Sequence, residues 1–166
     1  MGHNRAKGRS TVLTPGSAAP EMVLQDTTGH TVRLSDHVGR HAVLLYFMRS
    51  TTCPVCNRHV RDLAADADRF TAAGVQVLVA VPEDRGTAAA WKAKRNTPFP
   101  VLTALDGTPH ELVGLSRKVF GSMQQSGSIL VDTHGTVRHA HGSTLPTAAY
   151  DKKGVAAAIE SLHTPA

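Results

Sequence analysis

The residues best suited to chemistry are two cysteines three positions apart, in the segment Cys53-Pro54-Val55-Cys56. Two cysteines are too few for the disulfide framework of a small secreted protein. A bridge across so short a segment would also stabilise the chain little, because the entropic gain grows with the length of the closed loop. The pair therefore indicates thiol–disulfide redox chemistry rather than a structural bridge.

The elements on either side of the pair are predicted to place Cys53 at the start of a helix. The apolar run 41–48 is typical of a strand buried on both faces. Apolar positions after Cys53 recur with helical spacing until Gly74, and Pro54 suits the first helical position. The sulfur of Cys53 would then lie at a helix N-terminus, where the partial positive charge favours a thiolate. Nearby cations act in the same direction: Arg49, Arg58, His59 and Arg61.

Cys56 is predicted to lie one helical turn beyond Cys53, on the same face of the helix. From there it could attack an oxidised Cys53. The pattern thus assigns Cys53 as the nucleophile and Cys56, the more buried and less acidic thiol, as the resolving cysteine. Two alternatives remain open. Cys53, Cys56 and His59 could supply three ligands of a zinc site, although no fourth ligand is evident, or both cysteines could be inert core residues.

The rest of the sequence alternates between short strands and helices. Residues 1–19 lack apolar periodicity and are predicted to be a flexible tail, followed by one domain over residues 20–166. In that domain we expect hairpins at 22–34 and 128–140, strands at 75–81 and 99–102, and helices at 87–95, 111–120 and 154–162. This order predicts an α/β, thioredoxin-like fold, with a mixed central sheet, flanking helices and an extra N-terminal β-hairpin.

Composition and charge argue against several classes of protein. A chain of 166 residues with 41% hydrophobic and 19% charged residues is ordinary for one globular domain. No apolar run reaches the length of a membrane span, and the basic N-terminus lacks the apolar region of a signal peptide, so the cytoplasm is expected. The net charge of +5 is dispersed and aromatic residues make up only 4%, which argues against nucleic-acid binding. Most of the ten histidines are expected on the surface, and no cofactor or resident metal is expected.

Several segments between Pro20 and Leu162 together carry a resemblance to a known family. They are PEMVLQDTTGHTVRLSD (20–36), VLLYFMRSTTCPVC (43–56), GVQVLVAVPED (74–84), FPVL (99–102) and ILVDTHGTVR (129–138). These segments resemble the peroxiredoxins of the alkyl hydroperoxide reductase/thiol-specific antioxidant (redoxin) family. Arg49 and the CxxC pair are most similar to a peroxiredoxin-like branch with the pattern FYRGxWCPxC.

The resemblance implies an enzyme, a thiol-dependent peroxidase that reduces hydrogen peroxide or organic hydroperoxides. Cys53 would be the peroxidatic cysteine, oxidised to a sulfenic acid that Cys56 resolves to a disulfide. Ser50 stands where the family has a Thr or Ser that helps to orient the peroxide, and Arg49 would stabilise the leaving hydroxide. A thioredoxin-like protein or a low-molecular-weight thiol would be the reductant. A homodimer is a further expectation, since dimers are common in the family.

Three positions depart from the patterns of related proteins. Tyr46 stands in place of the family's proline seven residues before the cysteine. Ser126 stands in place of the active-site arginine, a charge for which Arg49 or Arg117 could substitute. The missing arginine favours an alternative function, a thioredoxin-like thiol–disulfide oxidoreductase that uses the same two sulfurs. Gly127, which stands where a thioredoxin carries its cis-proline, opposes that alternative. A third hypothesis is a redox sensor or zinc-binding module without enzymatic activity.

Overall fold

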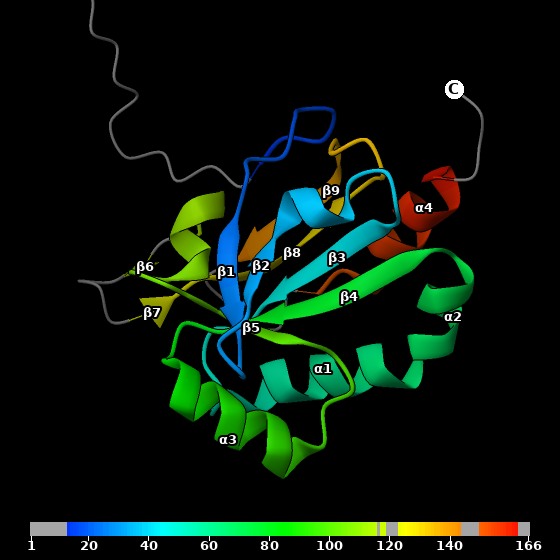
Figure 1. Cartoon of the computed structure of the whole chain (residues 1–166). Helices are drawn as coiled ribbons and strands as arrows, with labels where there is room; N and C mark the ends of the chain where they lie inside the picture. The colour runs from blue at the N-terminus through cyan, green and yellow to red at the C-terminus, as the bar shows by residue number, and fades with distance from the viewer. Residues whose placement is uncertain (1–12, 116, 119–122, 144–149, 163–166) are drawn as a thin grey trace, which may run out of the picture.

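The structure, a computed structural model, describes residues 13–115, 117–118, 123–143 and 150–162. Its centre is a seven-stranded mixed sheet in the order β2-β1-β5-β4-β3-β8-β9 (Figure 1). The strands of this sheet are β1 (Val23–Asp26), β2 (Thr31–Arg33), β3 (Ala42–Phe47), β4 (Val75–Ala80), β5 (Val101–Ala104), β8 (Ser126–Val131) and β9 (Val137–Ser143). The helices are α1 (Pro54–Ala65), α2 (Ala67–Ala72), α3 (Arg85–Arg95) and α4 (Lys152–Leu162), with short 3-10 turns η1 (Leu34–His37) and η2 (Pro109–Val113). In the described ranges no helix has both the length and the apolar character needed to cross a membrane.

Strand β3 lies in the interior of the sheet, and each of its residues is buried. It pairs in parallel with β4 and antiparallel with β8, so the sheet is mixed, as the sequence predicts. Its side chains alternate between two cores. Leu44 and Tyr46 pack with residues of α1, α3 and α4, whereas Leu45 and Phe47 pack with residues of η1 and η2. Figure 1 shows α1 and α3 together on one side of the sheet, and the predicted α/β architecture with its N-terminal hairpin β1–β2 is confirmed.

Helix α1 begins where the sequence predicts, at Pro54 immediately after Cys53. The helical run is divided at Asp66, which ends α1 and precedes α2, and Gly74 then takes a positive φ of 74° before β4 begins. The connection from β3 to α1 therefore brings the cysteine pair to the carboxyl end of the central strand.

The segment after β5 differs from the expectation. The helix predicted over 111–120 is wrong over its described part, because only the short turn η2 forms there. Pro109 starts this turn, and Gly114 ends it with a positive φ of 78°. The chain then enters β6 (Arg117–Lys118), which pairs antiparallel with β7 (Met123–Gln124).

Residues 16–19, expected in the flexible tail, pair instead with the start of β9. The N–H of Gly16 donates to the carbonyl oxygen of Val137 at 2.7 Å, and further backbone hydrogen bonds and an isolated bridge join the same two segments. β9 is an edge strand, so its free backbone groups need partners, and this segment supplies some of them. The folded part of the chain thus begins before Pro20, while residues 1–12 lie outside the described residues.

The close approach of β9 to β8 makes a glycine necessary at position 127. A Cβ atom there would lie 2.4 Å from the carbonyl oxygen of His141 and 3.0 Å from Cα of Gly142. We therefore expect Gly127→Ala to lower the free energy of unfolding by about 1–3 kcal/mol, the usual cost of overpacking, in a denaturant titration. Gly86→Ala in α3 is the matched control, because its nearest contact would be Asp84 Oδ1 at 3.6 Å. The control should raise stability by about 0.5–1 kcal/mol, and equal effects of the two substitutions would contradict the close approach.

Candidate active site

Cys53 occupies the N-cap position of α1, where a side chain normally accepts one of the free backbone N–H groups of the first turn. Its Sγ accepts the N–H of Cys56 at 3.3 Å. The bond satisfies one free N–H of the first turn and places the sulfur at the N-terminal end of the helix. The predicted placement of Cys53 at a helix N-terminus is confirmed.

Both cysteines are free thiols and both are buried, with exposed fractions of 2% for Cys53 and 0% for Cys56. Reactive cysteines are usually partly exposed, so the Cys53 sulfur must become more accessible before it can react with a substrate. Burial raises the pKa of the Cys56 thiol to about 12, and its hydrogen bond with Cys53 adds to the rise. The N–H of Arg49, which donates to Cys56 Sγ at 3.4 Å, acts in the opposite direction. Cys56 is thus the more buried thiol, as predicted, and a weaker acid than a free cysteine.

The loop before Cys53 is held by side chains that the sequence analysis did not single out. The carboxylate of Glu83, just after β4, accepts the N–H of Thr51 at 2.8 Å and also its hydroxyl. Asn57 Nδ2 donates to the carbonyl oxygens of Thr51 at 2.9 Å and Cys53 at 2.8 Å. Trp91 Nε1 on α3 in turn donates to Asn57 Oδ1 at 2.8 Å. Both the N–H and the carbonyl oxygen of Thr51 are therefore hydrogen-bonded. In the sequence, the only signal for this arrangement is the position of Asn57, one helical turn after Cys53.

Ser50 and Arg49, the other predicted site residues, lie in the turn that leads into α1. The carbonyl oxygen of Ser50 accepts the N–H of Cys53 at 3.3 Å, and its hydroxyl lies 3.1 Å from that of Thr52. Arg49 reaches Cys56 through its backbone N–H. Both residues are half-buried. The structure thus brings all four predicted site residues together, while the roles of Ser50 and Arg49 stay predictions.

The three residues that depart from the patterns of related proteins are Tyr46 on β3 and Ser126 and Gly127 on β8. Tyr46 is fully buried on β3, and its hydroxyl lies 2.7 Å from Nδ1 of His59 on α1. Ser126 is fully buried at the start of β8, at the end of the sheet where β3 leads to the cysteines. Gly127 pairs with the last residue of β3. The side chain of Arg117, named as a substitute for the missing arginine, lies outside the described residues.

Two histidines depart from the expected surface location. His59 has an exposed fraction of 9%, and His110 is fully buried with Nε2 2.6 Å from the carbonyl oxygen of Met48. The bond between His59 and the Tyr46 hydroxyl occupies the nitrogen that faces β3, which disfavours the zinc alternative. Across the described part of the chain, no group of three or more His, Cys, Asp or Glu residues is arranged to hold a metal ion.

A model of the AhpC/TSA family matches residues 15–140. The chain belongs to the AhpC/TSA family. This match includes the β3–α1 connection with both cysteines, so the resemblance read from the sequence is confirmed.

Individual relatives of this AhpC/TSA protein agree with the assignment. Rv2521 of Mycobacterium tuberculosis, which is named as a peroxiredoxin, is 33% identical over 98 residues, covering 59% of this chain and 62% of that protein. The peroxidoxin BcpB of M. tuberculosis has a TM-score of 0.77 at 20% identity, covering 92% of this chain and 99% of that chain. A Chlorobium tepidum structure described as a thiol:disulfide interchange protein DsbE has a TM-score of 0.68 at 26% identity, covering 89% of this chain and 99% of that chain. These similarities confirm the thioredoxin-like fold.

Asn57 joins the loop, the helix start and α3, so its removal should be costly. Asn57→Ala would delete the hydrogen bonds to Thr51 and Cys53 and leave the N–H of the buried Trp91 without its acceptor. We expect a loss of about 2–4 kcal/mol in the free energy of unfolding, because an unsatisfied buried donor costs about 1–3 kcal/mol and further bonds are lost. Trp91→Phe, which removes the indole donor and part of the ring but keeps both bonds from Asn57 Nδ2, should leave the loop 49–52 bonded to α1. Equal stability of Asn57→Ala and the native chain would contradict this role.

Proposed function

We propose that this chain is a thiol-dependent peroxidase that reduces hydrogen peroxide or organic hydroperoxides. The Cys53 thiolate attacks one oxygen of the peroxide, the O–O bond breaks, and the remaining hydroxide or alkoxide takes a proton and leaves as water or alcohol. Cys53 is then a sulfenic acid. Cys56 attacks this sulfur, forms the Cys53–Cys56 disulfide and releases the second oxygen as water.

The observation that carries the proposal is the contact between the two cysteines at the start of α1. The N–H of Cys56 donates to Cys53 Sγ at 3.3 Å, so the resolving residue already touches the sulfur that would be oxidised. Membership of the AhpC/TSA family supports a peroxide as the oxidant. The fold alone would not, since related folds carry other thiol chemistry.

The neighbouring residues have supporting roles in this proposal. The Ser50 hydroxyl orients the peroxide, and the Arg49 guanidinium and backbone N–H groups near Cys53 stabilise the leaving oxygen. The half-buried position of Ser50 and Arg49 in the turn before α1 supports these roles. An external thioredoxin-like protein or low-molecular-weight thiol then reduces the disulfide. A reducing compartment such as the cytoplasm suits this cycle, and a homodimer remains an expectation.

A second candidate is a thiol–disulfide oxidoreductase that uses the same two cysteines. Two observations favour it: Ser126 stands at the position of the peroxidase arginine, and the chain resembles a structure described as a thiol:disulfide interchange protein. Gly127 opposes it, because the position where a thioredoxin has its cis-proline is closed by β9 here. The peroxidase is therefore the better supported of the two.

One equivalent of hydrogen peroxide added to the reduced protein tests the peroxidase. Mass spectrometry should show an internal disulfide in the native chain and a dimedone-trapped sulfenic acid on Cys53 in Cys56→Ser. In Cys53→Ser, peroxide turnover should fall by at least about 10³-fold, since the nucleophile is removed. Cys56→Ser is the matched control, because it keeps the nucleophile and loses only the resolving step.

The same preparations separate the two candidates. A peroxidase reduces peroxide much faster than it catalyses the reduction of insulin disulfides, and the opposite order would assign an oxidoreductase. Peroxide turnover that survives in Cys53→Ser would show that Cys53 is not the nucleophile of the peroxidase.

A further inference from the structure

The resolving step poses a problem of protonation at Cys56. This residue must attack as a thiolate, yet it is fully buried. Burial raises the pKa of its thiol to about 12, so the thiolate is scarce at neutral pH. A buried thiol of this kind needs a base that takes its proton during the attack. A hydrogen-bonded pair behind Cys56 offers one.

Tyr46 and His59 form this pair in the core between β3 and α1. The Tyr46 hydroxyl lies 2.7 Å from Nδ1 of His59, and the two rings meet edge to face with centroids 5.7 Å apart. Tyr46 and Cys56 belong to the same buried core, where Tyr46 lowers the pKa of the Cys56 thiol and Cys56 raises that of the phenol. His59 follows Cys56 by three residues on α1, on the same side of the helix. The Cys56 thiol, the phenol and the imidazole are therefore neighbours in this part of the core.

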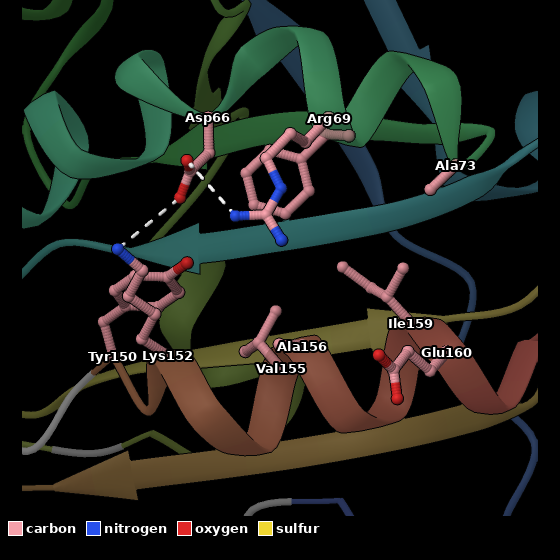
Figure 2. Close-up of a pocket in the computed structure, with 10 residues that line it drawn as sticks. Asp66, Arg69, Ala73, Tyr150, Lys152, Val155, Ala156, Ile159 and Glu160 are labelled. Carbon is pink, nitrogen blue, oxygen red and sulfur yellow. Dashed lines mark ion pairs between the residues drawn. The ribbon is translucent and has the colours of Figure 1, made fainter.

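Tyr150 covers the pair from the side of α4. Its ring centroid lies 5.8 Å from that of His59 and 6.3 Å from that of Tyr46. Tyr150 also lines a cavity of about 180 Å³ between α1–α2 and α4. Figure 2 shows this cavity, with the ion pair of Asp66 and Lys152 beside Tyr150. Only the ring of Tyr150 thus separates His59 from a cavity that is large enough to hold water.

The surroundings of His59 keep its imidazole neutral, so that it is free to accept a proton. Burial is the largest influence and lowers its pKa, Asp62 acts in the opposite direction, and Arg58 lowers the pKa further. His59 is therefore neutral at pH 7. Burial also raises the pKa of Tyr46, so a free phenolate does not accumulate, and the phenol can only pass a proton on as it receives one.

Other titratable groups face the pair from several elements. In the sheet, Tyr46 pairs with Ser128 of β8, which pairs with His141 of β9, so these side chains share one face. Among the described residues, the titratable and charged groups that act on Tyr46, His59 or Tyr150 are Cys53, Cys56, Arg58, Asp62, Asp66, Arg69 and Asp151, and Lys152 pairs with Asp66. His59 is distinguished among them by its direct hydrogen bond to the phenol next to Cys56.

We propose that Tyr46 and His59 form a proton relay that activates Cys56 as the resolving nucleophile. As Cys56 Sγ attacks Cys53, its proton passes to the Tyr46 oxygen while the phenol proton passes to Nδ1 of His59. The S–S bond forms and the S–O bond of the sulfenic acid breaks. The departing hydroxide takes a proton from water, and His59 returns its proton to water, so one water is the net product. The inference rests on the proposed resolving role of Cys56 but not on peroxide as the oxidant.

The aromatic disulfide dithiobis(nitrobenzoate) tests the relay without peroxide. Attack by Cys53 releases one coloured thionitrobenzoate and leaves a mixed disulfide, and attack by Cys56 then releases a second. Only the first release depends on reagent concentration, so excess reagent separates the two steps. We expect Tyr46→Phe and His59→Gln to slow the second release by about 10²–10⁴-fold at pH 7, the range of a lost general base. The first release should stay within about twofold of the native rate in both variants.

The pH profile distinguishes a relay from a merely structural role. In the native chain the second release should level off above the titration of His59, whereas in both variants it should rise about tenfold per pH unit, because the thiolate fraction of Cys56 then limits the rate. His59→Gln keeps a polar side chain and loses only the titratable base. Tyr150→Phe is the matched control, since it keeps the ring that covers the pair, and its rates should stay native.

Two results would overturn the relay. One is a second release in Tyr46→Phe and His59→Gln within about twofold of the native rate, and the other is a slowed release that keeps the native pH profile. The peroxide experiment remains separate. If peroxide gives neither the internal disulfide in the native chain nor a sulfenic acid on Cys53 in Cys56→Ser, the peroxidase proposal fails, while the release of thionitrobenzoate still reports on the relay.

Discussion

The structure depends on one capping interaction, the hydrogen bond from the N–H of Cys56 to the sulfur of Cys53. A helix must satisfy the free N–H groups of its first turn, and at the start of α1 a thiol takes the place of the usual hydroxyl or carboxylate oxygen. The same sulfur therefore starts the helix and is the candidate nucleophile. Its partner in the cap is also the residue proposed to attack it, so the folding of the helix start sets the geometry of the redox pair.

A cap of this kind is useful only if the loop before it is rigid. The loop leaves the carboxyl end of β3 and is tied to the end of β4 through Glu83 and to α3 through Asn57 and Trp91. These bonds satisfy polar groups that the burial of Cys53 would otherwise leave without partners. The carboxyl ends of two neighbouring parallel strands thus supply both the cysteines and their support, which is the usual arrangement of sites in such sheets.

Local signals in the sequence predict the parts of the site that follow from local physics. The apolar run before the cysteines specifies β3, and Pro54 specifies where α1 begins, so the capping position of Cys53 could be read directly. The burial of His59 could not be predicted in this way. It depends on how β3 and α1 pack against each other, and the loop between them has no periodic pattern that would indicate this packing. For the same reason the pairing of residues 16–19 with β9 was not foreseen, since it joins segments more than a hundred residues apart. The helix expected over 111–120 does not form in its described part, because Gly114 ends the 3-10 turn η2 before a longer helix can develop.

The unusual residue at position 46 has a physical explanation in its neighbours. A proline there would remove a backbone N–H from a strand that is paired on both sides, to β4 and to β8, as far as Phe47. Tyrosine keeps the strand intact but brings a hydroxyl into the core, and a buried hydroxyl needs a partner. His59 supplies that partner, and the same hydrogen bond gives the buried imidazole a partner for its Nδ1. The burial of Tyr46 and that of His59 therefore depend on each other, and the pair lies in the same core as the Cys56 thiol, whose pKa burial raises.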